Sequence, residues 1–186
     1  MNVDYIPGTT LPNTDKTASA FSYIEPLLSA TGGLSLSQVC AITGLEGSTI
    51  QNWVKRGWIS KPTMKKYDEI QVSRILIINA LRDSLSLEQI TGLLSFVNGS
   101  VTDISDDIIR ESQLFNYLCE AVKKLDISSG VSLKKIMELV KTTTASYVEP
   151  VSGAAGRLHK TMVVMVTGYL SGYLKREADQ FIKTFL

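Results

Sequence analysis

Two short helices in quick succession are encoded between Ser35 and Gly57, and this pair constrains the fold more than any other part of the sequence. Ser35 and Gln38 form the S-x-x-Q pattern of a capping box, in which each side chain binds the backbone N–H of the other residue. Gly44 predicts the end of this helix, because glycine readily adopts the left-handed conformation of a C-cap. A second helix is expected over 47–56, and Gly57 ends it.

The second helix has one apolar and one polar face. Ile50, Trp53 and Val54 recur at helical spacing, and we expect them to be buried. The opposite face carries hydroxyl, amide and basic side chains: Ser48, Thr49, Gln51, Asn52, Lys55 and Arg56. Such side chains read base edges and hold phosphates when a helix lies in the major groove of DNA. The pattern is typical of a helix-turn-helix motif.

Beyond the second helix, the sequence stays basic as far as Tyr67. The segment from Ser48 to Tyr67 holds five of the nineteen Lys and Arg residues and no acid. The rest of the chain carries fourteen basic and eighteen acidic side chains. A basic strip on a slightly acidic protein is the electrostatic footprint of nucleic-acid binding, although an ordinary solvated face gives the same count.

Several stretches of this region resemble MerR-type winged-helix regulators: Leu36–Leu45, Ser48–Ile50, Gly57–Ile59, Tyr67–Glu69, Ile70–Leu81 and Leu85–Leu94. More narrowly, the chain looks like an uncharacterised family of MerR-like bacterial proteins with a shortened wing and a helical C-terminal half. The resemblance implies an all-α, mainly helical fold. In that fold, a winged helix-turn-helix domain with a minimal β wing precedes a C-terminal helical domain.

The resemblance also implies which residues contact DNA. Four polar residues of the recognition helix, residues 47–56, correspond to groove-facing positions: Ser48, Thr49, Gln51 and Asn52. Six more are assigned to phosphates by charge and by position in the wing: Lys55, Arg56, Lys61, Lys65, Lys66 and Tyr67. Gln51 stands where the family pattern usually has arginine. Only seven residues separate Ile59 from Tyr67, so we expect Trp58–Ile59 and Met64–Tyr67 to form a short two-stranded wing or a bare loop.

The chain divides into three parts in this interpretation. Residues 1–17 are expected to form a flexible N-terminal arm, which either packs on the next domain or stays mobile. Residues 18–98 form the MerR-like DNA-binding domain, and Pro26 is expected to limit or kink its first helix. Residues 103–186 form a C-terminal helical domain for dimerisation or effector binding.

Three helices are expected in the C-terminal domain. Ser105 is interpreted as the N-cap of the first, because two acids follow it, and Ser132 as the start of the second. The third runs from about Ala154 to Phe185 and includes fourteen uncharged residues, Thr161–Leu174. A membrane span needs about twenty such residues, so this stretch is the core of the domain, a homodimer interface or both.

The sequence contains none of the common catalytic or metal-binding motifs. There is one histidine, His159, and no CxxC, HExxH, GxSxG, GxGxxG or phosphate-loop motif. Cys40 and Cys119 occupy apolar positions and are interpreted as buried thiols of a reducing compartment. We therefore expect a protein that is not an enzyme and that uses no metal or cofactor. The N-terminus has no apolar run of a secretory signal, so a cytoplasmic location is expected.

The leading hypothesis is a transcriptional regulator that binds double-stranded DNA as a homodimer. The second is a protein–protein interaction module on the same fold, which an exposed Trp58 beside Ile59 would favour. The third is a sensor whose C-terminal helices hold a small-molecule effector. Its pocket residues would be aromatic and Met side chains that also suit plain core packing: Tyr117, Met137, Tyr147, Met162, Met165, Tyr169 and Tyr173.

Overall fold

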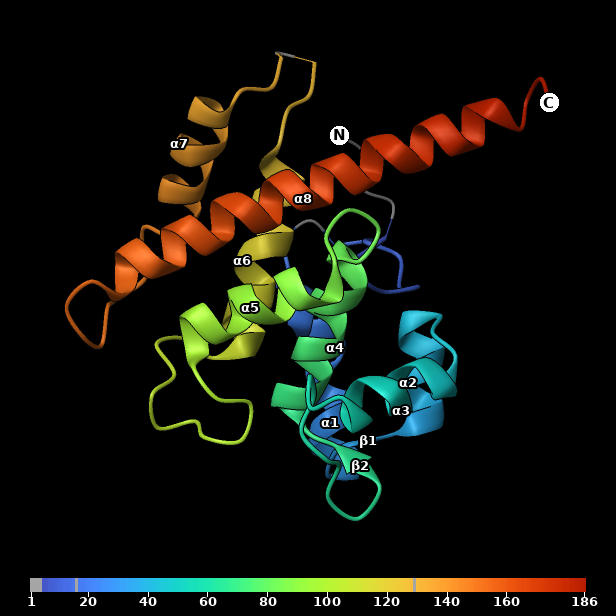
Figure 1. Ribbon diagram of the computed structural model, residues 1–186, viewed down its shortest axis with the longest axis vertical. Coiled ribbons are helices and arrows are strands. Elements are labelled where there is room, and N and C mark those ends of the chain that lie inside the picture. Colours follow the sequence, from blue (N-terminus) through green and yellow to red (C-terminus); the bar gives the residue numbers. More distant parts are fainter. Residues whose placement is uncertain (1–4, 16, 129) are drawn as a thin grey trace.

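The computed structural model describes residues 5–15, 17–128 and 130–186, and it is mainly helical, as predicted (Figure 1). The first half contains the 3₁₀ helix η1 (Ala20–Tyr23) and the helices α1 (Glu25–Thr31), α2 (Leu36–Thr43), α3 (Gly47–Lys55), α4 (Glu69–Leu81) and α5 (Leu87–Asn98). The second half contains α6 (Glu111–Lys124), α7 (Leu133–Thr143) and α8 (Ala154–Ile182). Two short strands, β1 (Leu34–Ser35) and β2 (Lys66–Tyr67), pair antiparallel with Leu34 opposite Tyr67.

Local capping signals account for many of the helix boundaries. The capping box predicted at Ser35 and Gln38 is present at the start of α2, and Gly44 ends this helix with a φ of 70°. The same reciprocal arrangement starts α4, through Asp68 and Gln71. The first expected helix is divided into η1 and α1, and Pro26 lies in the first turn of α1, where the missing N–H of proline costs nothing.

Helix α4 lies at the centre of a single hydrophobic core. Ten of its thirteen residues are buried, so it has no solvent-facing side over most of its length. It packs against α2 and α5 from the first half and against α6 and α8 from the second. Residues 18–98 and 103–186 therefore share one core, and the segment around residue 100 is a surface connection rather than a break between separate cores.

The apolar stretch of α8 packs inside this chain. Gly168 and Gly172 face the turn between α4 and α5, where a Cβ on Gly168 would lie 3.0 Å from Leu85 Cδ1. The two glycines therefore allow α8 to cross that turn closely. Beyond residue 173, α8 continues past the other helices, and its side chains become mostly exposed (Figure 1). None of the helices in the described ranges has the length and apolar composition that crossing a membrane requires.

Helix α6 begins later than the sequence indicated. The predicted N-cap at Ser105 is wrong, because residues 101–110 form an irregular segment and the helix starts at Glu111. Two bonds from the buried Asn98 side chain fix this segment: Nδ2 donates to the Ile109 carbonyl, and Oδ1 accepts from the Ile109 N–H. Ile109 is thereby held in the core without helical backbone bonds.

Residues 5–15 of the predicted arm pack on the first half of the protein. Ile6 is 2% exposed and belongs to the core. The Thr10 N–H donates to the Ile42 carbonyl at 2.7 Å, and the Asn79 side chain of α4 donates to the Gly8 carbonyl at 2.9 Å. Of the two alternatives for the arm, packing is therefore the one seen for these residues. Residues 1–4 and 16 lie outside the described residues.

This packing makes Gly8 sensitive to substitution. Gly8 has a φ of 73°, and an added Cβ would collide with the Leu76 carbonyl of α4. We expect Gly8→Ala to lower the free energy of unfolding by about 2–4 kcal/mol, from left-handed strain and overpacking together. Gly32→Ala is the matched control, because its φ of 61° is similar and no atom lies within 4 Å of its added Cβ. If urea denaturation showed the same loss of unfolding free energy for both variants, the result would argue against a packed N-terminal arm.

Candidate nucleic-acid interface

Helix α3 is fixed by its apolar face and leaves its polar face in solvent. Ile50 and Trp53 are buried as predicted, and Val54 is half-buried against the core. On the other face, Ser48, Gln51, Asn52, Lys55 and Arg56 are exposed, and Thr49 is half-buried. The structure therefore brings all six predicted residues of this helix to one accessible face.

Residues 57–65 follow α3 and form what we call the connecting loop. The side chain of Gln71 holds this loop to the core. Gln71 Nε2 donates to the Ser60 carbonyl at 3.0 Å and to the Lys61 carbonyl at 2.9 Å, and its Oε1 accepts from the Asp68 N–H. Gln71 is itself buried in α4. The Gln71 amide group bonds both the N-cap of α4 and the connecting loop. This one side chain therefore fixes Ser60 and Lys61, the stem of the connecting loop, to the core.

The strand pairing within this region differs from the prediction. Trp58–Ile59 is not a strand, since Ile59 enters the core and the next two carbonyls are bound by Gln71. The return segment does form a strand, but β2 pairs with β1 at the start of α2 instead. Of the two expected forms, the two-stranded wing is therefore not formed between these two segments, and a loop leads instead to β2, which pairs with β1.

The tip of the connecting loop is a tight turn. The Lys66 N–H donates to the Thr63 carbonyl at 2.8 Å, and both central residues, Met64 and Lys65, have positive φ. Positive φ at both central positions is the backbone signature of a type I′ turn. Met64 is 91% exposed. The turn thus projects Met64 and Lys65 away from the protein.

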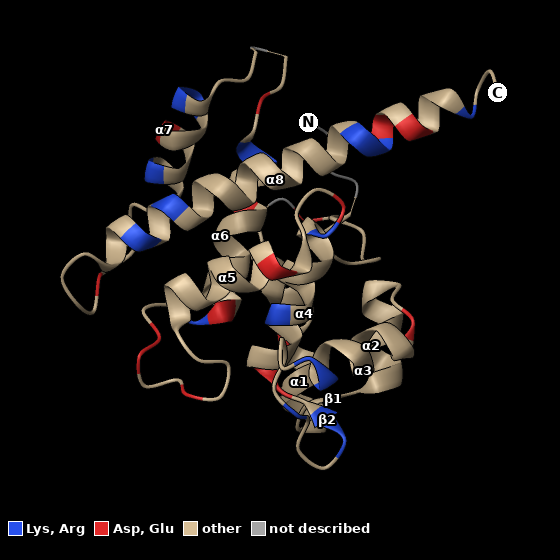
Figure 2. Cartoon of the chain, viewed as in Figure 1, with Lys and Arg blue, Asp and Glu red and all other residues tan. Residues whose placement is uncertain are grey.

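Five basic side chains surround the C-terminal end of α3 and the connecting loop, and we call them the basic strip: Lys55, Arg56, Lys61, Lys65 and Lys66. Figure 2 shows basic positions, in blue, gathered around β2 and the loop that precedes it. Lys66 is half-buried and the other four are exposed. Within the part of the chain that the structure describes, none of the five forms an ion pair with a carboxylate. The basic strip therefore presents uncompensated positive charge.

Tyr67 does not belong to this surface, although we assigned it to a phosphate. It is 3% exposed and lies in the core opposite Leu34, and burial raises the pKa of its phenol. Its place at the end of β2 turns the side chain inward while Lys66, one residue earlier, is turned outward, as alternation along a strand requires. The assignment of Tyr67 to DNA is therefore corrected.

Trp58 is half-buried and is covered by a cation. The Arg56 guanidinium lies over the indole ring at 5.1 Å from its centroid, and the neighbouring Ile59 is 1% exposed. The apolar patch that would have favoured a protein-binding surface at Trp58–Ile59 is therefore not formed. Instead, the stacking holds Arg56 in a defined position on the surface.

Arg82 joins the candidate interface from a distant part of the sequence. It is the exposed C-cap residue of α4, and it lines a shallow hollow together with Ser48, Thr49 and Asn52 of α3. No pattern along the sequence links Arg82 to α3, because only the packing of α4 brings them together. Basic side chains consequently lie near both ends of α3, with Arg82 near its N-terminal half and the basic strip near its C-terminal end.

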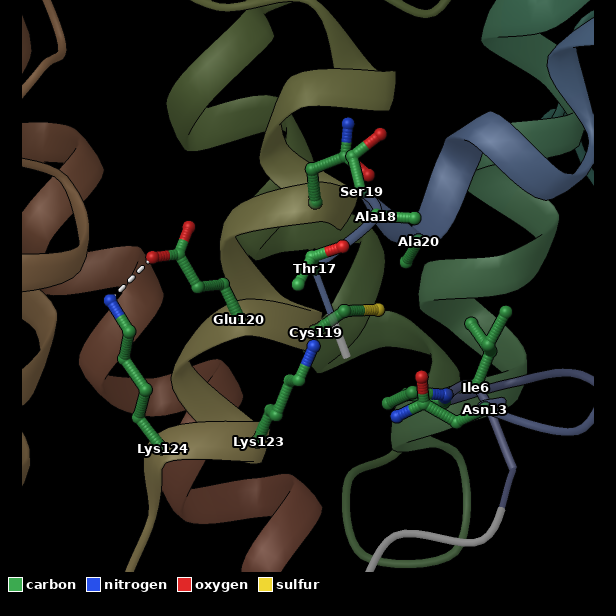
Figure 3. A pocket seen from close by; sticks show the side chains of 12 residues that line it. Ile6, Asn13, Thr17, Ala18, Ser19, Ala20, Cys119, Glu120, Lys123 and Lys124 are labelled. Atoms are coloured by element: carbon green, nitrogen blue, oxygen red, sulfur yellow. Dashed lines mark hydrogen bonds and ion pairs between the residues drawn. The ribbon is translucent and has the colours of Figure 1, made fainter. Parts of the chain in front are cut away.

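The residues predicted to line an effector pocket do not gather in one cavity. Tyr117, Met162, Met165 and Tyr169 are core residues, and Met137 is exposed on α7. A cavity of about 370 Å³ lies elsewhere, between the N-terminal segment and α6 (Figure 3). The buried Cys119 lines this cavity, and burial raises the pKa of its thiol well above the ordinary value. Among the described residues, no three His, Cys, Asp or Glu side chains are grouped to hold a metal ion.

Comparison with known proteins finds similar sequences, but the descriptions of these sequences state no function. Residues 30–118 match a family model described as a domain of unknown function, DUF1836. The chain is 31% identical over 109 residues to the uncharacterized protein YkrK of Bacillus subtilis (strain 168). That alignment covers 55% of this chain and 47% of YkrK, so the chain spans about half the length of this relative. No solved structure matches significantly. The matched residues 30–118 include α3, the basic strip and Arg82.

The role of Gln71 as an anchor can be tested against an equivalent residue without that role. We expect Gln71→Ala to destabilise the protein by about 2–3 kcal/mol, because the partly buried carbonyls of Ser60 and Lys61 lose their donor and the α4 cap loses its acceptor. Gln89→Ala is the control, since Gln89 completes the capping box of α5 but is exposed. It should cost only about 0.5–1 kcal/mol.

Limited trypsin digestion provides the local readout for the same pair of variants. The Gln71 variant should be cut faster after Lys65, whereas the Lys61–Pro62 bond resists trypsin, and the Gln89 variant should be cut at the wild-type rate. Equal cleavage in all three proteins would show that the loop is held by something other than Gln71.

Proposed function

We propose that this protein is a MerR-like winged helix-turn-helix transcriptional regulator that binds double-stranded DNA as a homodimer. In this proposal, α2 and α3 form the helix-turn-helix, α3 enters the major groove, and the connecting loop is a shortened wing. The observation that carries the proposal is the basic strip, which forms no ion pair with any described carboxylate and lies beside the exposed polar face of α3.

The polar face of α3 suits base recognition. Gln51 and Asn52 are exposed, and carboxamides of this kind can form paired hydrogen bonds with adenine in the major groove. Ser48 and Thr49 supply hydroxyls that can donate or accept. The buried Ile50 and Trp53 fix the axis of α3, so these polar groups are presented without a large ordering cost on binding.

The basic strip and Arg82 suit phosphates on both sides of a groove that α3 occupies. Arg82 lies near the N-terminal half of the helix, and Lys55 and Arg56 follow at its C-terminal end. Lys61, Lys65 and Lys66 extend the charge along the connecting loop. Each neutralised phosphate releases counterions, and the slope of log affinity against log salt changes by about 0.9 per contact.

The exposed end of α8 supports the homodimer. Leu174 and Phe181 are 51% and 69% exposed, and the ring of Phe185, just past the end of α8, contacts the ring of Phe181. These residues lie where α8 extends beyond the other helices (Figure 1). Apolar side chains gathered on a projecting helix are suited to pairing with a second copy, and two DNA-reading surfaces would then bind two half-sites.

The first experiment is fluorescence anisotropy with a mixed-sequence DNA duplex at several salt concentrations, after light scattering has established the mass of the protein. We expect a dimer whose affinity falls steeply with salt. Lys65→Ala with Lys66→Ala should weaken binding to all sequences alike and reduce the salt slope by about two per subunit. No detectable binding at low salt would refute the proposed function.

The matched control removes two lysines far from the interface. Lys134 and Lys141 lie on α7 and are exposed, so replacing both by alanine changes the net charge of the protein equally. This variant should retain the wild-type slope. A loss equal to that of the Lys65 and Lys66 variant would assign binding to overall charge rather than to the connecting loop.

Two single substitutions should distinguish base recognition from phosphate binding. We expect Asn52→Ala to reduce discrimination among selected sequences by about 1–3 kcal/mol with the salt slope preserved. Arg82→Ala should instead lower the slope by about one per subunit with sequence preference preserved. Competition binding with a selected site and its point variants measures both quantities. The proposed roles would be wrong if the two substitutions gave the same pattern.

A further inference from the structure

Met64, at the tip of the connecting loop, is an apolar side chain that contributes nothing to the core. It is 91% exposed, although methionine is a residue that ordinarily fills gaps in a protein interior. Figure 1 shows the loop projecting at the edge of the molecule, beyond β2. Single apolar side chains are common on protein surfaces, so the backbone and the neighbours of Met64 matter more than its exposure alone.

The backbone that carries Met64 is strained. Met64 and Lys65 have φ values of 48° and 61°, and among the described residues they are the only ones other than glycine with positive φ. A turn with positive φ at both central positions favours Asn-Gly or Gly-Gly, because a Cβ costs free energy there. The sequence therefore holds Met and Lys where smaller residues would form the same turn more readily. Strain of this kind is typical of positions that have a function.

Lysines lie on both arms of this turn. Lys61 is in the arm that leads to Met64, and Lys66 is in the arm that returns from it. Neither forms an ion pair with a carboxylate of the described residues. Cations on two arms of one turn suit phosphates of the two strands that border a groove of DNA. A turn bound in this way directs its tip toward the base edges.

The minor groove is the groove that this tip reaches when α3 occupies the major groove. The connecting loop begins directly after α3, and Gln71 holds the Ser60 and Lys61 carbonyls to the core. The loop therefore leaves from the C-terminal end of α3, and the next groove across the sugar–phosphate backbone is the minor groove. Methionine is among the apolar residues that proteins insert between base pairs from that groove. Pyrimidine–purine steps such as TA unstack most easily.

We infer that Met64 enters the minor groove of bound DNA and separates one base step, which bends the duplex toward the major groove. Lys61 and Lys66 hold phosphates on the two sides of the groove, and the strained turn directs the Met64 side chain toward the bases. Insertion favours a flexible pyrimidine–purine step at a position that α3 does not contact. This inference rests on the proposed function, and it adds sequence selection to the phosphate binding assigned to the connecting loop.

The bend is measured by energy transfer between dyes at the two ends of a duplex that carries a selected binding site. Saturating wild-type protein should bend this DNA by about 20° or more, and Met64→Ala should leave it nearly straight. Met64→Leu should retain the bend, because leucine is apolar and similar in volume. Met137→Ala is the matched control at an exposed methionine of α7, and it should bend DNA like the wild type. Since no charge changes, all variants should keep the wild-type salt slope.

The preference for a flexible step gives a second readout. Duplexes that carry either TA or AA at one step beside the α3 half-site are compared, and the step is moved one base pair at a time. A·T and T·A pairs present the same acceptors in the minor groove, so a difference there reports unstacking rather than base contacts. The wild type should prefer TA roughly fivefold to tenfold at one position, and Met64→Ala should lose this preference.

The outcomes separate this inference from the proposed function. A wild-type protein that binds no DNA would refute the proposed function, and the inference with it. If the wild type binds with a steep salt dependence, but Met64→Ala bends the DNA and discriminates between the two steps equally well, the inference alone is overturned. A wild type that binds and leaves the DNA straight would also overturn it.

Discussion

Helix α4 is buried along most of its length, and the polar side chains that it carries into the core determine where the neighbouring segments lie. Gln71 binds the carbonyls at the stem of the connecting loop, Arg74 pairs with Glu111 of α6, and Asn79 donates to the carbonyls of Gly8 and Thr43. Each of these groups would cost about 1–3 kcal/mol if it were buried without its partner. The loop, α6, the N-terminal segment and the end of α2 are therefore held in register with α4 by hydrogen bonds as well as by apolar packing.

This arrangement explains how so short a helix as α3 can present a fixed surface. A helix of nine residues is not stable alone in water, because nucleation is unfavourable and few hydrogen bonds follow it. Its stability comes from Ile50 and Trp53, which insert into the core that α4 organises. The connecting loop is similarly fixed at its stem and open at its tip, where Met64 and Lys65 project. In the proposed function, this combination orients the groove-facing groups before binding and leaves the phosphate-binding lysines free to adjust.

The parts of the structure that could be predicted are those determined by neighbouring residues. The capping box at Ser35 and Gln38, the left-handed Gly44 and the burial of Ile50 and Trp53 all follow from short-range chemistry. The start of α6 was predicted incorrectly because it is determined by tertiary contacts. Ser105 resembles a cap locally, but Asn98 holds Ile109 outside a helix. Tyr67 was misassigned because the pairing of β2 with β1, which turns it inward, joins segments far apart in the chain. Arg82 was missed for the same reason, since only the packing of α4 places it beside α3.

The second half of the chain is coupled to the candidate interface through the same core. The family match ends within α6, yet α6 and α8 both pack against α4, and Met162, Met165 and Val166 of α8 are buried. A fragment that ended at residue 118 would expose that side of the core to water, so the matched segment is not an independent folding unit in this protein. In the proposed homodimer, a second copy on the end of α8 would contact a helix that packs against α4. A signal from that interface to α3 would therefore pass through the core that α4 organises, and the first turn of α4 also carries the Gln71 anchor.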